Sequence, residues 1–102
     1  MFEIFTYEDD DGRKPYAEWL VKLPDRQAIS RVLVRVSRMA GGNFGDCKPV
    51  ADGVWELLID WGPGYRVYFI QQQDICVVLL AGGEKSSQDR DIRQAKALAR
   101  DL

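Results

Sequence analysis

An arginine stands in a segment whose residue pattern is that of a β-strand. In 65–71 the side chains alternate between two faces, so that apolar residues suit a core while Arg66 and Tyr68 face the other way. A guanidinium offers parallel donors that match the oxygens of a phosphate, so Arg66 could bind a phosphate on an open sheet face. An exposed face with ordinary polar residues, or a salt bridge that anchors the turn at 62–64, would account for this arginine equally well.

Three further arginines recur at the spacing of one helical stripe. Arg31, Arg35 and Arg38 stand at i, i+4 and i+7 in a segment whose apolar residues occupy a different stripe. This stripe indicates either a solvated helix face or a basic surface that contacts the phosphates of a nucleic acid. The sequence leaves both interpretations open.

The residue types that are absent exclude several kinds of site. The chain has no histidine, which excludes a histidine general base, a Ser-His-Asp triad and histidine metal ligands. Its two cysteines, Cys47 and Cys76, do not form a CxxC pair, so we expect no zinc site and two reduced cysteines in or near strands. We expect the protein to need no metal or other cofactor.

The composition is that of one globular domain with unevenly placed charge. The 102 residues are 46% hydrophobic and 29% charged, and 14 basic and 16 acidic side chains give a formal charge of −2. Four acidic residues fall together at 8–11, where we expect a solvated turn rather than a calcium loop, because the alternating spacing of such a loop is missing. No apolar stretch reaches the roughly 18 residues of a membrane span, and the N-terminus lacks a signal-peptide pattern, so we expect a cytoplasmic protein.

The apolar patterns and turn residues predict the elements that must position these side chains. We expect a strand at 2–7, a short helix from Pro15, a second helix from the cap Asp25 to about Ala40, and a last helix capped by Ser86 or Ser87. Further strands are expected at 48–51, 54–61, 65–71 and 75–81, with Gly82-Gly83 ending the last of them. The predicted fold is α+β in one domain over 1–102: a small antiparallel sheet with an N-terminal helical hairpin and a C-terminal helix, the helices covering one face.

Several motifs occur in a fixed order along the chain. They are Gly42–Asp46, Gly53–Leu57, Gly62–Phe69 and Gly82–Gln88, followed by Asp91-Ile92 and Ala95. In this order the chain resembles the HigB-type, "addiction module killer" branch of the RelE/ParE toxin superfamily, over nearly its whole length. The resemblance implies a RelE-like fold and the toxin of a type II toxin–antitoxin module. It also implies a ribosome-dependent endoribonuclease (an mRNA interferase), neutralised by a small antitoxin that often has a helix-turn-helix.

The resemblance implies particular catalytic residues. Arg66 stands at the family's arginine that contacts the scissile phosphate, and Lys85 occupies the cationic position just after Gly82-Gly83. Lys48 matches a lysine in the short strand before the Gly-Val-Trp segment, and Asp46 lies close to an acidic candidate base of some relatives.

Other residues are expected to contact RNA. Tyr68 and Gln88 are neighbours of the family's site, and Arg31, Arg35 and Arg38 would touch ribosomal RNA if their stripe is functional. Cleavage by attack of the RNA's own 2′-OH needs a base, positive charge on the phosphorane and a proton for the leaving 5′ oxygen. Arginine and lysine can supply the charge and the proton without histidine or metal, giving 2′,3′-cyclic phosphate and 5′-hydroxyl ends.

Two departures from the family pattern bear on activity. Leu58 stands where this branch has arginine, which removes one cation from the open face. No tyrosine or histidine follows Lys85 near the C-terminus, where several potent relatives carry one. The alternative function is therefore that of a ParE-like toxin without a nuclease site, which binds and poisons DNA gyrase, although Lys48, Arg66 and Lys85 together favour the nuclease.

Overall fold

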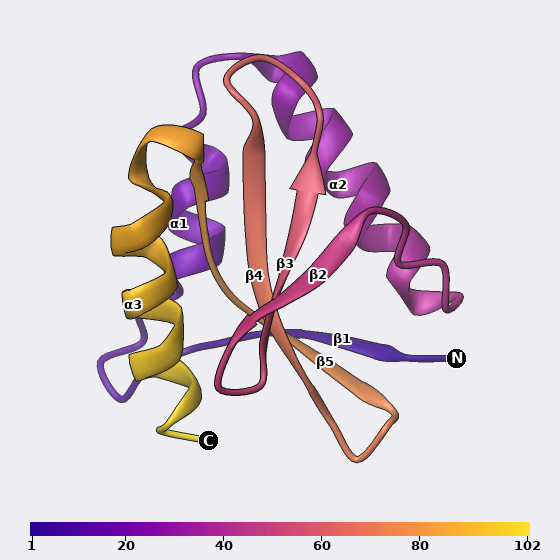
Figure 1. The fold of residues 1–102 in the computed structure, drawn as a ribbon, viewed down its shortest axis with the longest axis vertical. Coiled ribbons are helices and arrows are strands. Elements are labelled where there is room, and N and C mark those ends of the chain that lie inside the picture. Colours follow the sequence, from indigo (N-terminus) through magenta and orange to yellow (C-terminus); the bar gives the residue numbers. More distant parts are fainter.

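Five strands form one mixed sheet in the computed structural model, which describes residues 1–102 (Figure 1). The sheet order is β1-β5-β4-β3-β2, and the strands from β2 to β5 pair with one another in antiparallel fashion. The strands are β1 (Glu3–Thr6), β2 (Cys47–Ala51), β3 (Val54–Ile59), β4 (Tyr65–Gln72) and β5 (Cys76–Glu84).

The expectation of a wholly antiparallel sheet is wrong for β1. This strand runs parallel to β5 at one edge, with Glu3 opposite Cys76. A tight hairpin forces two strands to run antiparallel, whereas β1 is separated from β5 by most of the chain and is free of that constraint.

The helices begin and end where local residues favour it. Pro15 occupies the first turn of α1 (Pro15–Val21), and the Asp25 carboxylate accepts the Gln27 N–H at 2.8 Å to cap α2 (Arg26–Ala40). Figure 1 shows that α2 runs back in a direction roughly opposite to α1, as expected for a helical hairpin. A short 3₁₀ turn, η1 (Lys85–Ser87), leads into α3 (Gln88–Ala99).

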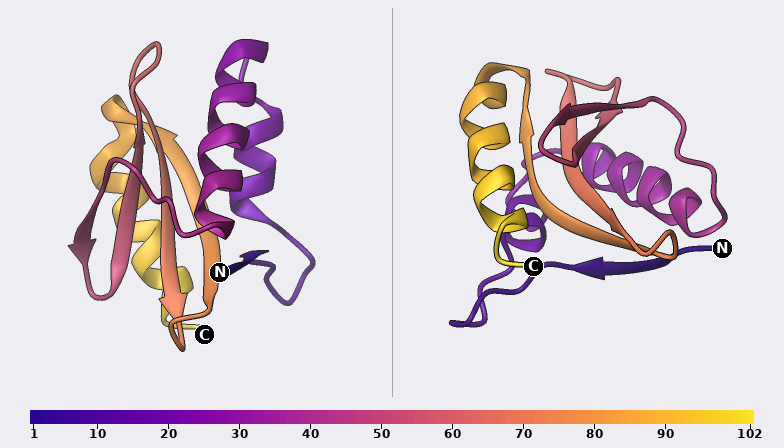
Figure 2. Two further views of the ribbon diagram at one scale, coloured as in Figure 1. Left: turned by 90° about the vertical axis from the view of Figure 1, so that its right-hand side faces the viewer. Right: turned by 60° about the horizontal axis from the view of Figure 1, so that its bottom comes forward.

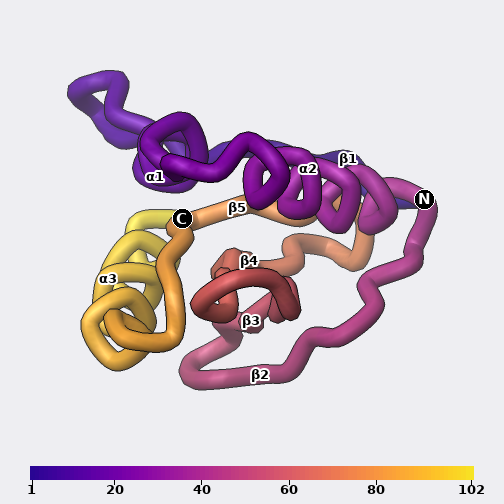
Figure 3. The backbone as a smooth tube through the Cα atoms, turned by 90° about the horizontal axis from the view of Figure 1, so that it is seen from above, coloured from indigo at the N-terminus to yellow at the C-terminus, as the bar shows by residue number.

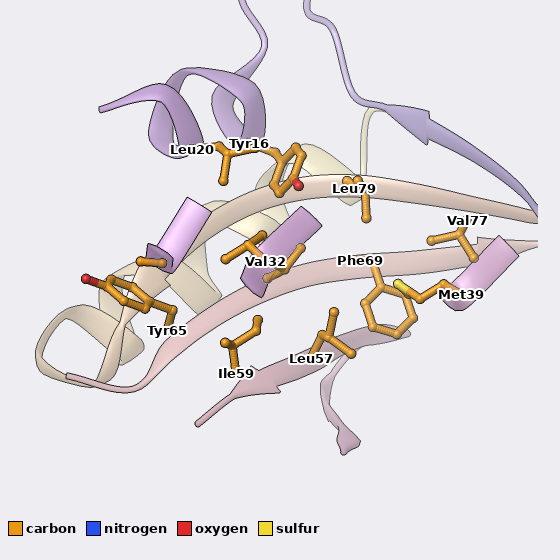
Figure 4. Close-up of a cluster of buried hydrophobic side chains, with 12 residues drawn as sticks. Tyr16, Leu20, Val32, Met39, Leu57, Ile59, Tyr65, Phe69, Val77 and Leu79 are labelled. Carbon is orange, nitrogen blue, oxygen red and sulfur yellow. The ribbon is translucent and has the colours of Figure 1, made fainter. Parts of the chain in front are cut away.

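The first core cluster lies between the sheet and the two N-terminal helices (Figure 4). Alternate residues of the strands face this side, so the cluster is almost entirely apolar. Figure 3 shows α1 and α2 lying along the part of the sheet that holds β5 and β1. The buried members of the cluster are Tyr16, Leu20, Ala28, Val32, Met39, Leu57, Ile59, Tyr65, Val67, Phe69, Val77 and Leu79.

The opposite face of the sheet is covered by α3, and the expectation that all helices lie on one face is wrong. Figure 2 shows the strands between α3 and the N-terminal helices. The apolar side of α3, with Ala95 fully buried, packs on the residues that alternate with the first cluster. A second cluster results, whose buried members are Tyr7, Val54, Tyr68, Val78, Leu80, Ala81 and Ala95.

Gly82 and Gly83 continue β5 instead of ending it, contrary to the expectation from sequence. A Cβ atom at Gly82 would collide with the indole of Trp19, and one at Gly83 would collide with the carboxylate of Asp91. The two glycines therefore let α1 and α3 approach the strand closely from its two faces.

Two smaller expectations are confirmed. The acidic segment forms a turn in which the Asp9 carboxylate accepts the backbone N–H groups of Asp11 and Arg13, at 2.9 and 2.8 Å. Cys47 and Cys76 are both free and half-buried, each at the start of a strand.

No helix in the structure combines the length and apolar character that a membrane crossing requires.

Candidate functional site

A buried carboxylate lies at the centre of the candidate site. The side chain of Glu56 on β3 is 1% exposed, in a place where an isolated charge would be very costly. Three side chains surround it: Arg66 Nε lies 3.3 Å from Oε2, Gln88 Nε2 donates to Oε2 at 2.8 Å, and Lys48 Nζ lies 4.0 Å from Oε1. We call Glu56, Arg66, Gln88 and Lys48 the Glu56 network.

The strand register explains how residues far apart in the sequence meet. Lys48 on β2 stands opposite Glu56, which stands opposite Tyr68 on β4. The next row of the same face places Leu58 opposite Arg66. The side chains in these rows point to one face because residues two apart along a strand share a face.

The turn before β4 connects Arg66 to Lys85. Gly64 has a φ of +81°, a conformation that favours glycine, and its carbonyl accepts two hydrogen bonds. Arg66 Nη1 donates to this carbonyl oxygen at 3.0 Å. The backbone N–H of Lys85 donates to the same oxygen at 3.1 Å. Arg66 therefore anchors its own turn, through a carbonyl and not through a salt bridge within the turn, and η1 begins beside it.

Arg66 and the two lysines differ in their accessibility. The Arg66 side chain is only 11% exposed, because Glu56 and the Gly64 carbonyl hold it against the sheet. The side chain of Lys48 is 67% exposed, and Lys85 is also an exposed residue. Lys48 and Lys85 are thus the cations that a bound anion would meet first.

Tyr68 is fully buried beneath α3, where its hydroxyl has no hydrogen-bond partner. Burial, and next the negative charge of Glu56, raise the pKa of Tyr68 well above its ordinary value. This tyrosine lies beside the Glu56 network, but it cannot touch an RNA while α3 covers it.

Gln88 and Lys85 border a polar hollow at the start of α3. The hollow has a volume of about 530 Å³ and is lined by η1 and the first turns of α3, including Arg90 and Arg93. Two basic residues that the sequence did not single out therefore extend the positive surface next to Lys85.

Asp46 lies at the margin of the site. It precedes β2 by one residue and is exposed, and its backbone carbonyl accepts the Leu58 N–H at 3.0 Å. Its carboxylate makes none of the ion pairs of the Glu56 network. The structure thus places the candidate base beside the network but not within it.

The three arginines of the helical stripe have separate roles in the structure. Arg35 Nη1 donates to the Leu58 carbonyl at 2.6 Å, and its Nη2 donates to the carbonyls of Phe44 and Asp46 at 3.3 Å. The Arg31 guanidinium lies 3.8 Å from the ring centroid of Trp61. Arg38 is exposed near the end of α2.

Sequence reasoning missed Glu56, the residue on which the network depends. The available signal was its position as the one acidic residue in the apolar segment Val54–Ile59, on the same face as Arg66 by strand alternation. A second buried acid, Asp91, accepts a hydrogen bond of 2.5 Å from Ser87 Oγ and ties α3 to the turn before it.

Comparison with known proteins identifies a relative without a described function. No protein-family model matches the chain. An uncharacterized protein of Haemophilus influenzae is 51% identical over 87 residues, which cover 85% of this chain and 88% of that protein. The chain belongs to the family of this Haemophilus influenzae protein. Membership in this family names no activity.

The arrangement is suited to anion binding in particular. A guanidinium that pairs with Glu56 and donates to the Gly64 carbonyl, with exposed lysines on β2 and at the start of η1, offers positive charge to a phosphate. No three histidine, cysteine, aspartate or glutamate side chains gather in a way that could hold a metal ion.

Proposed function

We propose that the protein is the toxin of a type II toxin–antitoxin module, a ribosome-dependent mRNA endonuclease with a RelE-like fold. The observation that carries this proposal is the Glu56 network, in which a buried carboxylate orients Arg66 while Lys48 and Lys85 stay exposed beside it. The antiparallel strands β2–β5, preceded by two helices, support the RelE-like assignment.

Arg66 would bind the scissile phosphate through the part of its guanidinium that remains free. Its Nε faces Glu56 and its Nη1 donates to the Gly64 carbonyl, so Nη2 is the nitrogen left for a phosphate oxygen. Glu56 acts as a positioning residue, since a carboxylate that is 1% exposed cannot itself reach an RNA.

The two lysines would stabilise the charge that develops during cleavage. Lys85 would neutralise the phosphorane or protonate the leaving 5′ oxygen, and Lys48 would add positive charge from the other side of Arg66. Asp46, an exposed carboxylate two residues before Lys48, is the candidate base for the 2′-OH. The products would be 2′,3′-cyclic phosphate and 5′-hydroxyl ends, and the proposed chemistry uses no metal.

A ParE-like toxin that poisons DNA gyrase without cleaving RNA is the second candidate. The low exposure of Arg66 and the apolar Leu58 opposite it favour this function, because both reduce the positive charge that an RNA would meet.

Lys85 offers the sharpest test, since it is exposed and its replacement should leave the fold intact. Purified protein would be added to translating ribosomes, and the mRNA ends would be mapped by primer extension. We expect Lys85→Met to lower cleavage by about 100-fold. Lys85→Arg should keep partial activity if the residue supplies charge, and none if it donates a proton, because arginine stays protonated.

Lys22→Met is the matched control, because Lys22 is exposed just after α1 and makes none of the contacts of the Glu56 network. This variant should cleave like the wild type. Growth arrest with uncut mRNA and inhibited gyrase would favour the ParE-like function. Absence of growth arrest, cleavage and gyrase inhibition would rule out both toxins.

The proposed partners are the ribosome with its mRNA and a cognate antitoxin, in the cytoplasm. The antitoxin is expected to be a small helix-turn-helix protein encoded next to this chain. Co-expression of the neighbouring reading frame should restore growth, and its failure to do so would contradict the module.

A further inference from the structure

Helix α2 carries a net positive charge, whereas the rest of the molecule is net negative. Its 15 residues include four arginines and no acidic residue, so its formal charge is +4. The other 87 residues hold 10 basic and 16 acidic side chains, for a formal charge of −6. An acidic partner would therefore be attracted to α2 and repelled by most of the remaining surface.

A groove follows α2 on the side that borders the end of β3. It has a volume of about 610 Å³ and lies against Ile59 and Asp60. Its α2 residues recur every three or four positions from Arg26 to Arg38, so the groove extends along about 18 Å of helix. Figure 1 shows α2 at the margin of the molecule, with no other element on its outer side.

Two aliphatic side chains are exposed among these arginines. Leu33 is 49% exposed and Val34 is 47% exposed, and Val34 lines the groove itself. The outer side of α2 thus combines an apolar centre with guanidinium groups at both ends, from Arg26 and Arg38.

We propose that this groove is the docking site for an acidic amphipathic helix of a partner protein. The apolar stripe of such a helix would cover Val34 in the groove and the neighbouring exposed Leu33 outside it, while its carboxylates would pair with Arg26 and Arg38. The length of the groove matches about three turns of helix.

The geometry favours a protein over a nucleic acid at this groove. The ring of Trp61 is covered by Arg31, which lines the groove, and its indole N–H donates to Asp25 at 3.0 Å, so this ring is already occupied. Arg35 is engaged with three backbone carbonyls. A phosphate backbone would leave Leu33 and Val34 uncovered, whereas an amphipathic helix would bury them.

The docking site and the Glu56 network lie on different sides of the sheet. α2 packs with the first core cluster, whereas the network lies on the face covered by α3. A partner in the groove would leave Lys48 and Lys85 accessible. The proposal is therefore independent of the nuclease assignment.

Binding of designed probes to the intact protein would test the docking site. The first probe is a helical peptide of about three turns with a leucine stripe flanked by glutamates. The second has lysine in place of each glutamate, and the third is a single-stranded oligoribonucleotide. Affinity would be followed by titration, and the site by NMR shifts of the α2 backbone amides.

We expect the acidic peptide to bind and to shift the α2 amides, with the lysine peptide at least about tenfold weaker. Val34→Glu and Arg38→Glu should each weaken binding of the acidic peptide by about tenfold or more, since the first replaces an apolar contact with a negative charge and the second reverses a positive charge. Arg100→Glu, at the far end of α3, is the matched charge reversal and should change nothing at α2.

Three outcomes would overturn the proposal. They are no binding of the acidic peptide, equal binding of the acidic and lysine peptides, and binding that neither α2 variant weakens. If the oligoribonucleotide shifts the signals of the α2 amides and neither peptide does, the surface binds RNA instead.

Discussion

The two faces of the sheet are built from the same strands but differ in what they bury. The face beneath α1 and α2 holds an almost wholly apolar cluster, in which Phe69 packs against Phe44 and Trp55. The face beneath α3 holds a smaller cluster together with the buried acids Glu56 and Asp91. Alternation along each strand is enough to produce both.

The two faces differ in the substitutions that they can tolerate. An apolar cluster gains stability in proportion to the area it buries, and its members can be exchanged for others of similar volume. A buried carboxylate must keep each of its partners, because an unpaired charge costs several kcal/mol. The α3 face therefore tolerates fewer substitutions, and its buried carboxylate holds Arg66 in one orientation.

The largest expected effect is on the apolar face. Phe69→Ala should lower the free energy of unfolding by about 3–5 kcal/mol, since it removes a ring that is 1% exposed and leaves a cavity. Urea denaturation would measure this. Ile75→Ala, at a residue that is 51% exposed, is the control and should cost less than about 1 kcal/mol. Equal losses for the two variants would contradict the packing described for Phe69.

Breaking the ion pair between Glu56 and Arg66 should show that the α3 face depends on paired charges. Glu56→Leu should cost about 3 kcal/mol or more, because Arg66 then keeps its charge in a place that is 11% exposed without its partner. Adding Arg66→Met should restore most of the loss, since two apolar side chains can replace a buried pair. A double variant that is less stable than the single one would show that the charges are not coupled.

The close approach of α3 to β5 should also be measurable. Gly83→Ala should destabilise by about 1–3 kcal/mol, because its Cβ would occupy the position of the Asp91 carboxylate. Asp91→Ala in the same chain should recover part of the loss by vacating that position. Full stability of Gly83→Ala alone would show that the carboxylate moves aside freely.

The smallest effects are expected in the titration of two tyrosines, one on each face. Burial alone raises the pKa of Tyr16 to about 12, whereas burial and then the charge of Glu56 raise that of Tyr68. Ultraviolet absorbance of tyrosinate should show that Glu56→Gln lowers the pKa of Tyr68 and leaves that of Tyr16 unchanged. Equal shifts in the pKa values of Tyr68 and Tyr16 would contradict an effect of the Glu56 charge that is confined to the α3 face.

The raised pKa of Tyr16 also predicts how the stability of the protein falls at alkaline pH. Unfolded Tyr16 would ionise near its ordinary pKa of 10.0, and the folded protein holds the proton up to about 12. The stabilisation is present below the lower value and is lost as the pH rises between the two. Tyr16→Phe should flatten this part of the stability profile, as measured by urea denaturation at several pH values.

Local residue patterns predicted the elements well, because caps, turns and periodicity act within a few residues. Pro15, Asp25 and the strand that contains Arg66 all lie where the sequence places them. The parallel pairing of β1 and the position of α3 on the second face were not predicted, because both depend on contacts between distant parts of the chain.

The candidate site was predicted in part for the same reason. Lys48, Arg66 and Gln88 do meet, and they meet at Glu56, which sequence reasoning passed over as one residue of a strand. The burial of Tyr68 depends on which face α3 covers, and the separate roles of the α2 arginines depend on which carbonyls and rings lie within reach. Neither can be read from spacing along one segment.

The parallel strand β1 also affects when the molecule can acquire its shape during synthesis. β1 is made first, but its partner β5 is made after most of the chain, since Glu3 pairs with Cys76 and Thr6 with Leu79. β5 also contributes to both core clusters, so neither can close before this strand has left the ribosomal tunnel. A nascent chain that stops before β5 therefore remains open to proteases and chaperones, and any activity begins only after β5 has been made.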